Sequence, residues 1–373
     1  MNKHNLNLIF EQYISRFAEL NDLNTYDEGY KWRAESCFLE HWNIEAEDFP
    51  AMFKASTKEM SNLIDNATVQ PIGGILLLLK QPDEVEFVRG CFRELYAEDG
   101  GDLEARQDRI YAFMKKMNAK IDQYASGSWK YPQKMNNVIY YLSLRYPSEN
   151  YIFKATEATE WANCIEYGDD FGSGESFSLA KYYRMCDELR DAVSENEEIM
   201  RLHSLRFEKE ARGFDDEYHI LVYDIIYCAH TYNFYMDGIV QTTSARARIK
   251  RAQIRDEIEN LEEELATATE LCQKCELVAE REINMIGMEV KHKAFGTGKI
   301  ISQTNGIQVI AFAAGEKKFQ VPAAYTGGFL IADAKTMAAL QEEDNRRKGL
   351  EKARKKAASL TEQINKLKSS LTE

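Results

Sequence analysis

Residues that interrupt helices are scarce in this chain. Its 373 residues include only 6 prolines and 20 glycines. Proline removes a backbone donor inside a helix, and glycine lowers helix stability by roughly 1 kcal/mol relative to alanine. We therefore expect long uninterrupted helices. A hydrophobic content of 44% and a charged content of 29% also exclude a disordered chain.

Long apolar runs and an even set of cysteines are lacking as well. No apolar run, residues 75–79 included, approaches the roughly 18 residues that a membrane span requires. Residues 1–9 lack the apolar region of a signal peptide. The seven cysteines are odd in number and scattered, which disfavours a disulfide framework. We expect a cytoplasmic protein with reduced thiols and no membrane segment.

The chain carries no established catalytic signature. Four patterns are missing: a Gly-x-x-x-x-Gly-Lys-[Ser/Thr] phosphate loop, Gly-x-Ser-x-Gly, His-Glu-x-x-His and a Rossmann glycine fingerprint. No convincing Pro-Asp…Glu-x-Lys nuclease pattern is present either. Nothing in the sequence therefore supports ATP hydrolysis, and no cofactor is expected. Any chemistry has to come from residue clusters without a known signature.

The net charge of −14 hides an asymmetry along the chain. Residues 1–245 hold 25 Lys and Arg against 42 Asp and Glu, whereas residues 246–373 hold 22 against 19. The first part is strongly acidic and repels nucleic acid on average, while the second part does not.

Two regularly spaced stripes mark the C-terminal part. In the first, apolar or small residues follow each other at intervals of four and three: Ile254, Ile258, Leu261, Leu265, Ala268, Cys272, Cys275 and Ala279. The second alternates three and four: Leu350, Ala353, Ala357, Leu360, Ile364, Leu367 and Leu371. This spacing predicts two helices that pack as a coiled coil.

The charges of these helices indicate that they pair with each other. Residues 252–283 carry three basic and ten acidic side chains, and residues 346–368 carry nine basic and two acidic ones. Opposite charges favour this pairing over self-association, so we expect an intramolecular antiparallel hairpin. The basic clusters 346–348 and 354–356 are then balanced by the acidic helix, which we favour over DNA contact. The oligomeric state stays open.

A segment of opposite character lies between the two helices. Within residues 286–332, Asn305-Gly306 separates two β-branched runs, which is the strongest short signal of a β-hairpin. Gly296-x-Gly298 and Gly315-Glu316 mark two further turns. Four or five short strands joined by tight turns predict a small closed barrel.

Two stretches of this segment resemble known modules: Val290-Lys-His-Lys-Ala-Phe-Gly-Thr-Gly-Lys-Ile300 and Gly315-Glu-Lys-Lys-Phe319. They are similar to the Tudor-like or SH3-like module at the C-terminus of UvrD/PcrA-type helicases. They also resemble the RNA-polymerase-interaction modules of CarD-type proteins. The resemblance covers about 45 residues. It implies an SH3-like barrel that binds RNA polymerase, another protein or nucleic acid.

The residues expected to contact that partner are mostly basic. Within residues 286–331, five lysines stand against Glu289 and Glu316, and a basic face can contact phosphates or an acidic protein. The predicted partner-binding residues are Lys291, His292, Lys293, Phe295, Lys299, Lys317 and Lys318. A solvated barrel surface is the alternative for the lysines, and His292 also suits a turn or packing role.

Residues 1–245 show the apolar spacing of helices. Intervals of three and four recur in residues 6–20, 49–64, 85–96, 103–124 and 179–193. Abundant Tyr and Phe indicate a large core. Residues 138–154 combine a helix, a Tyr-Pro stop and a short extended segment. They resemble a string in the N-terminal domains of bacterial restriction and phage-defence proteins.

Two clusters have the residue types of a metal or acid–base site. Cys272 and Cys275 have CxxC spacing, but no second ligand pair accompanies them and both belong to the first stripe, which favours a core role. A glycine-rich loop offers carboxylates for a divalent cation or for acid–base chemistry, with a plain exposed loop as the alternative: Glu166, Asp169, Asp170 and Glu175.

A third cluster combines carboxylates with histidine, the groups that a hydrolytic metal site uses: Asp215, Asp216, Glu217, His219, Cys228 and His230. The apolar run 220–227 between them indicates a buried element. We therefore expect His230 to be a hydrogen-bonded core histidine, and no complete metal site is predicted.

Together these patterns predict an α+β, mostly α protein with four parts. These are an acidic, aromatic-rich helical domain (1–245), a first coiled-coil helix (246–285), an SH3-like barrel (286–332) and a second coiled-coil helix (333–373). Our first hypothesis is a non-enzymatic adaptor whose barrel engages a protein or nucleic-acid complex, in phage defence or DNA transactions. The alternative is a metal-dependent hydrolase or nuclease with its site in the helical domain, around Asp169, Asp170, Glu175 or Asp216.

Overall fold

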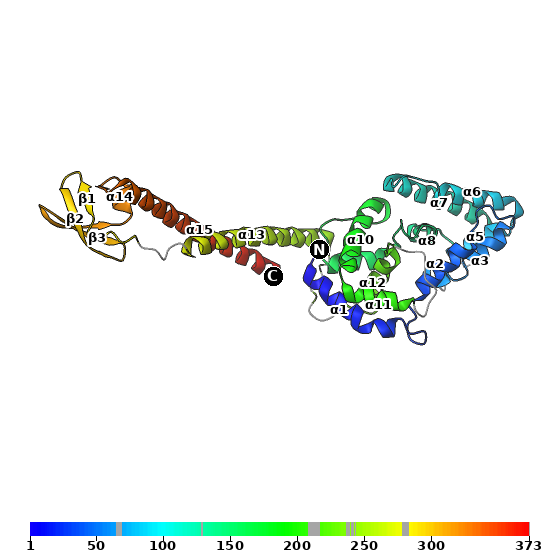
Figure 1. Cartoon of the computed structure of the whole chain (residues 1–373). Coiled ribbons are helices and arrows are strands. Elements are labelled where there is room, and N and C mark those ends of the chain that lie inside the picture. The colour runs from blue at the N-terminus through cyan, green and yellow to red at the C-terminus, as the bar shows by residue number, and fades with distance from the viewer. Residues whose placement is uncertain are drawn as a thin grey trace. The chain divides into compact units, whose positions relative to one another are not determined.

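The structure is a computed structural model, and it describes residues 1–64, 69–127, 130–207, 217–235, 239, 242, 244–277 and 283–372 (Figure 1). The chain divides into two compact units, Met1–Ala252 and Gln253–Glu373, and each is described by itself. Helices make up most of the chain, and five strands form one small sheet in the second unit. The expected α+β, mostly α class is confirmed.

The first unit is built from helices. They are α1 (Lys3–Leu20), α2 (Tyr30–His41), α3 (Phe49–Ser56), α4 (Ser61–Ile64), α5 (Pro71–Leu79), α6 (Val85–Leu95), α7 (Leu103–Tyr124), α8 (Met135–Arg145), α9 (Ala155–Cys164), α10 (Leu179–Ser194), α11 (Glu197–Arg206) and α12 (His219–Thr231), with short 3₁₀ turns at Pro82–Glu84 and Gly174–Ser176. Helix α13 (Ala245–Leu277) begins in this unit and continues into the second one.

Helix α7 illustrates how the sequence pattern produces these helices. The Asp102 carboxylate caps its N-terminus by accepting hydrogen bonds from the backbone N–H groups of Glu104 (3.0 Å) and Ala105 (3.1 Å). Its apolar residues recur every three or four positions and are buried: Ile110, Phe113, Met117 and Ile121. The predicted helix at 103–124 is confirmed.

The single helix predicted at 49–64 is wrong, because α3 ends at Ser56 and α4 begins at Ser61. The Ser56 hydroxyl donates to the carbonyl oxygen of Met52 and the Thr57 hydroxyl to that of Phe53. Side-chain bonds of this kind compete with the backbone ladder and favour a break. Apolar spacing alone does not indicate that a helix ends at such a position.

The core of the first unit is rich in aromatic rings, as expected. Trp32, Trp161, Tyr140 and Tyr223 are all fully buried. The hydroxyls of Tyr140 and Tyr223 lie 2.7 Å apart and hydrogen-bond each other. This bond pairs the two hydroxyl groups with each other inside the core.

In the second unit, α13 and α15 (Ala334–Thr372) lie side by side and run antiparallel (Figure 1). Most residues of the two predicted stripes are buried or half-buried there, while most of their neighbours are exposed; Ala279 lies outside the described residues. Ion pairs join acidic residues of α13 to basic residues of α15: Glu276–Arg354 (2.5 Å), Glu264–Lys356 (2.9 Å) and Glu262–Lys368 (2.7 Å). The predicted charge complementarity is therefore observed. Such exposed pairs stabilise by at most about 1 kcal/mol each, so the stripes contribute more.

The sheet of the second unit is antiparallel, with the strand order β4-β3-β2-β1-β5. The strands are β1 (Glu289–His292), β2 (Gly296–Thr304), β3 (Ile307–Phe312), β4 (Gly315–Gln320) and β5 (Leu330–Ile331). Asn305 and Gly306 form the turn between β2 and β3, with φ of 52° and 72°. Positive φ at both positions suits an Asn-Gly pair, and the predicted hairpin is confirmed.

The two faces of this sheet differ. The inner face is buried: Val290, Ile300 and Ile310 pack with Tyr325 of α14 (Ala323–Thr326) and with Leu340 of α15. The outer face holds the alternate residues of each strand and is largely exposed. We call residues 283–340, which include this sheet and the parts of α14 and α15 that cover it, the sheet module.

Candidate functional site

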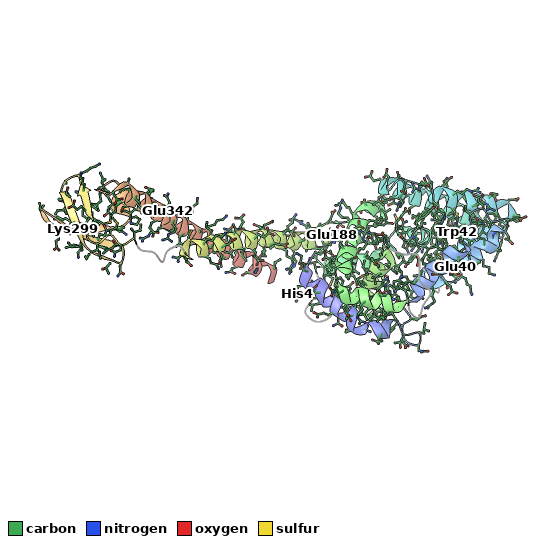
Figure 2. The ribbon with its side chains drawn as sticks, in the orientation of Figure 1. His4, Glu40, Trp42, Glu188, Lys299 and Glu342 are labelled. Carbon is green, nitrogen blue, oxygen red and sulfur yellow. The ribbon has the colours of Figure 1, made fainter. Side chains whose placement is uncertain are left out.

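The seven predicted partner-binding residues do not form one surface. Strand alternation places His292 and Lys317 on the inner side of the sheet, because they pair with the buried Leu330 and Ile310. The other five lie elsewhere: Lys291, Lys299 and Lys318 on the outer face, and Lys293 and Phe295 in the turn between β1 and β2. Figure 2 labels Lys299 on the sheet.

An aromatic cluster lies beside Lys317. The His292 ring stacks on Phe295, with 4.5 Å between the centroids and 20° between the planes, and its centroid lies 5.4 Å from that of Phe319. The Lys317 ammonium lies 5.5 Å from the centroid of the Phe295 ring, within cation–π range. The three rings are half-buried, so part of their surface is open to a partner.

His292 also holds the turn that follows β1. Its Nδ1 accepts hydrogen bonds from the backbone N–H groups of Ala294 (3.1 Å) and Phe295 (3.3 Å). In the neutral ring the proton therefore resides on Nε2. The structure shows the turn role that the sequence suggested for this histidine.

The five predicted lysines of the sheet module form no ion pair with a described carboxylate, although Glu289 lies opposite Lys299. Lys291, Lys293, Lys299, Lys317 and Lys318 are exposed, and no carboxylate oxygen of a described residue lies within 4.0 Å of their ammonium groups. Many basic side chains of α15, by contrast, are in ion pairs: Arg346, Arg347, Lys348, Arg354, Lys355, Lys356 and Lys368. The module therefore keeps its positive charge available, while much of the charge of α15 is neutralised.

A second role for two of these lysines follows from their position on an edge strand. β4 carries Lys317 and Lys318, and among the described strands it pairs with β3 alone. Lysines on an edge strand oppose pairing with the edge of another sheet. If these lysines only prevent pairing with another sheet edge, they need no binding partner. Binding experiments therefore distinguish this protective role from a role in partner binding.

The acidic loop in the first unit is neutralised by basic residues of its own chain. Asp169 pairs with Lys181 (2.9 Å) and Arg184 (3.4 Å), and Asp170 lies 3.8 Å from Arg248. Burial raises the pKa of Asp169, but the Lys181 and Arg184 cations outweigh it and hold that pKa below its usual range. A carboxylate paired in this way is a weaker ligand for a divalent cation.

The start of α13 is held by the same loop. Glu166 is buried and accepts hydrogen bonds from Arg251 Nε (2.7 Å) and from Asn2 Nδ2 (3.2 Å). Glu175 is exposed. The loop therefore has the contacts of an anchor for α13, and the four predicted carboxylates do not converge on a common cation position among the described residues.

The third predicted cluster is only partly described, since Asp215 and Asp216 lie outside the described residues. Glu217 is exposed, and His219 is buried with its ring centroid 4.1 Å from that of Tyr151. His230 Nδ1 lies 2.7 Å from Glu160 Oε2. The expected hydrogen bond of His230 is thus present. Its expected core location is wrong, because the residue sits in the last turn of α12 with its side chain 30% exposed.

Cys272 and Cys275 lie on α13 within the first stripe and are half-buried rather than buried. Their thiols are free, and the carbonyl of Cys275 accepts a hydrogen bond from Arg346 Nη1 at 2.5 Å. A two-helix interface leaves its seam residues one open flank, which explains the partial exposure.

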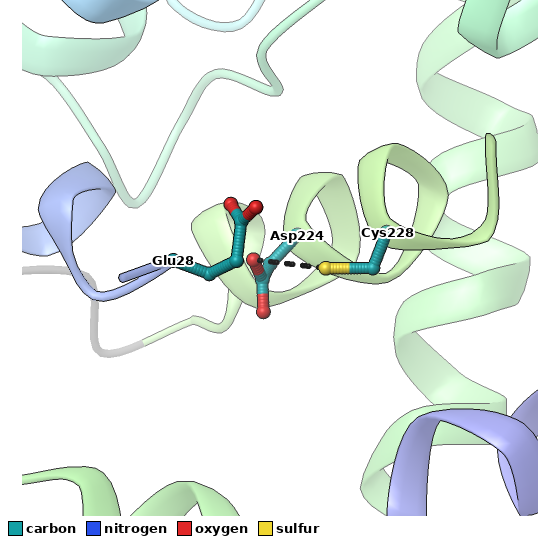
Figure 3. Close-up of side chains that lie close together, drawn as sticks. All are labelled: Glu28, Asp224 and Cys228. Carbon is teal, nitrogen blue, oxygen red and sulfur yellow. Dashed lines mark hydrogen bonds between the residues drawn. The ribbon is translucent and has the colours of Figure 1, made fainter. Parts of the chain in front are cut away.

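A charged cluster that the sequence analysis did not identify lies inside the first unit (Figure 3). Lys31 is fully buried, and its Nζ contacts the Glu28 carboxylate and Asp224 Oδ1, the latter at 2.6 Å. The Cys228 thiol donates to the same Asp224 oxygen at 3.6 Å. The donor atoms of Glu28, Asp224 and Cys228 lie within 4.8 Å of one another, as in a metal site. The Lys31 ammonium supplies the cation that these carboxylates require.

Arg206 and Tyr13 complete this network. Arg206 Nη2 and the Tyr13 hydroxyl donate to Asp224 Oδ2 at 3.0 and 2.6 Å. Burial raises the pKa of Asp224, but Lys31 and Arg206 outweigh it and hold the pKa below its usual range. Two buried cations thus balance two buried carboxylates, which is the arrangement of a structural network.

A cavity of about 640 Å³ borders the loop between α6 and α7. Its charged groups already bind one another: Arg106 donates to both oxygens of Asp99 at 2.8 Å, and Arg109 pairs with the same carboxylate. Arg106 also donates to the carbonyl of Glu149 at 3.0 Å. These contacts connect the loop to α7. Both oxygens of the Asp99 carboxylate are already hydrogen-bonded to arginine side chains.

Comparison with known proteins yields no relative: no family model, curated protein or solved structure matches the chain. Among the helices of the described residues, none has both the length and the apolarity to cross a membrane.

Proposed function

We propose that this protein is a non-enzymatic binding protein whose sheet module engages a protein or nucleic-acid complex. The observation that carries the proposal is the set of exposed lysines that form no ion pair with a described carboxylate, next to the half-buried rings of His292, Phe295 and Phe319. In an acidic chain, such positive charge is free to complement a negative partner.

The finer architecture belongs to the same proposal. We interpret the curled five-stranded sheet as an SH3-like barrel and the α13–α15 pair as a coiled-coil hairpin that carries it. The buried stripes and the ion pairs between the helices support the hairpin. The resemblance to UvrD/PcrA-type and CarD-type modules supports a transcription or DNA-transaction partner in the cytoplasm. The resemblance of residues 138–154 supports a setting in bacterial phage defence.

A charge-reversal experiment on the intact chain tests the proposal. The binding variant changes Lys291, Lys293, Lys317 and Lys318 to Glu. The matched control makes the same charge change at four exposed lysines outside the sheet module that form no ion pair with a described carboxylate: Lys54, Lys80, Lys352 and Lys366. Each protein is affinity-purified from its native cells, with and without nuclease. We expect the wild type and the control to retain the same partner and the binding variant to lose it.

The outcomes separate the two roles of the lysines. If the binding variant keeps its partner, the sheet module is not the binding site and the edge lysines have a protective role. If the partner disappears from the wild type only after nuclease treatment, it is nucleic acid. Circular dichroism of the binding variant confirms that the loss of partner is not a loss of fold.

A further inference from the structure

The outer face of the sheet is more apolar than a solvated face should be. In antiparallel sheets with one open face, that face usually carries polar side chains. Here Ile301 of β2 and Ile307 of β3 are 44% and 46% exposed, and Val309 between them on the same face is half-buried. Exposed aliphatic side chains that lie together often mark an interaction surface, whereas single scattered ones are common on any protein surface.

Ile301 lies on this face at a β-bulge. The pairing of β2 with β3 shifts between Ile300 and Ser302, so that Ile300 faces Ile310 in the core and Ser302 faces Val309. Ile301 is the extra residue, and it is exposed while Ile300 is buried. Strand alternation after the buried Ile300 already turns Ile301 outward. The bulge adds Ser302 as a second residue opposite Val309, so Ile301 and Ser302 together face that position.

Two lysines flank this apolar group. Lys318 lies directly opposite Val309 on β4, and Lys299 lies opposite Ala311, the next outward residue of β3. No carboxylate oxygen of the described chain lies within 4.0 Å of either ammonium group. We call Lys299, Ile301, Ile307, Val309 and Lys318 the outer patch.

We propose that the outer patch binds a protein segment that presents apolar side chains next to aspartate or glutamate. The inference rests on the proposed binding function and names the partner's chemistry. The isoleucines gain free energy only if a partner covers them with apolar surface. The flanking lysines select carboxylates beside that surface.

A nucleic acid fits this patch less well. Phosphates gain nothing from Ile301 and Ile307, and no outward residue of β2, β3 or β4 carries an aromatic ring that could stack a base. Glu289 and Glu316 border the patch, opposite Lys299 and Ala311. A polyanion is repelled there, whereas a protein segment can place neutral or basic residues against the two glutamates.

In the test, a displayed library of random peptides is selected for binding to the immobilised intact chain. Mixed-sequence duplex DNA and single-stranded RNA are tested for binding as further probes. Enriched peptides are then measured against two variants, Ile301→Ser with Ile307→Ser, and Lys318→Glu. Ile331→Ser is the matched control, because Ile331 is a 51% exposed isoleucine on the same face but outside the patch, opposite Lys291. All substituted positions are exposed, and circular dichroism checks the fold.

We expect enriched peptides to combine Leu, Ile, Val or Phe with Asp or Glu, and each patch variant to weaken their binding about tenfold or more while the control does not. The proposal is overturned if no peptide is enriched, if the peptides lack acidic residues, if Ile331→Ser weakens binding equally, or if only the nucleic acids bind. If the native partner depends on the lysines tested above but not on the isoleucines, the outer patch is refuted and the binding function stands.

Discussion

The ring of Phe312 on β3 lies against the backbone of Gly298 on β2. A Cβ atom at Gly298 would come 2.5 Å from Phe312 Cδ1 and 2.7 Å from Ile310 Cγ2, so only glycine fits beneath the ring. Gly298→Ala should therefore force Phe312 away from its neighbour Phe295, whose ring centroid lies 5.6 Å from its own. We expect a loss of about 1–3 kcal/mol in the free energy of unfolding of the second unit, measured by urea denaturation.

Gly349→Ala is the control within the same unit. Gly349 lies inside α15, and a Cβ there would meet nothing within 4 Å. This change should stabilise the helix by up to about 1 kcal/mol. An equal response of the two variants would contradict the packing argument.

Removing the buried cation of the first unit should be costly. Lys31→Met leaves Glu28 and Asp224 close together without the ammonium that joins them, and such a loss typically costs about 3–5 kcal/mol. Lys181→Met removes an exposed partner of Asp169 and should cost about 1 kcal/mol or less. Equilibrium urea unfolding measures both. Adding Glu28→Gln to Lys31→Met should recover part of the loss, and full additivity of the two changes would argue against a coupled network.

Asp99 should make the first unit sensitive to acid. The hydrogen bond from Arg106 lowers the pKa of Asp99, as do those from the Gly101 N–H and Arg109, and together they outweigh the effect of burial. The folded-state pKa is thus below the unfolded value of about 3.9. The stabilisation is fully present above that pH and is lost as the pH falls through the folded pKa. Below about pH 4, the urea midpoint of the wild type should fall more steeply than that of Asp99→Asn. Parallel pH profiles would show that Asp99 does not contribute.

The stripe on α15 should matter more than the exposed apolar residues of the pair. Leu360 is buried within the stripe, whereas Leu271 of α13 is 49% exposed and lies outside the first stripe. Leu360→Ala should cost about 2–4 kcal/mol and Leu271→Ala well under 1 kcal/mol, measured as free energies of unfolding of the second unit. A similar cost for the two would mean that the stripe does not form the interface between the helices.

The sequence predicted most of the local structure, because periodicity and turn chemistry act over short distances. The stripes, the helix at 103–124 and the Asn305-Gly306 hairpin could be identified from spacing alone. The break between α3 and α4 was not predicted, because it depends on side-chain hydroxyl groups that donate hydrogen bonds to backbone carbonyls of the preceding turn. The SH3-like and coiled-coil interpretations and the seven partner-binding residues stay predictions.

The buried network of the first unit could not be found in this way, because its members come from distant parts of the chain. Asp224 did carry a signal, since a carboxylate inside the apolar run 220–227 needs a buried partner. The identity of that partner, Lys31, depends on how α2 and α12 pack. The separation of the lysines onto two faces likewise follows from strand register, which the segment's sequence leaves open.

The network also has a consequence for synthesis on the ribosome. Tyr13 and Asp224 are 211 positions apart, and Lys31 and Asp224 are 193 apart. At roughly 5–20 residues per second, the ribosome makes Asp224 about 10–40 s after Lys31. Until then Asp224 is not available to accept the hydrogen bond from the Lys31 ammonium. Burial of α2 at that stage would remove this charged group from water without its partner, which is unfavourable. The first unit should therefore close late, when α12 has emerged, and a chain truncated before α12 should remain open.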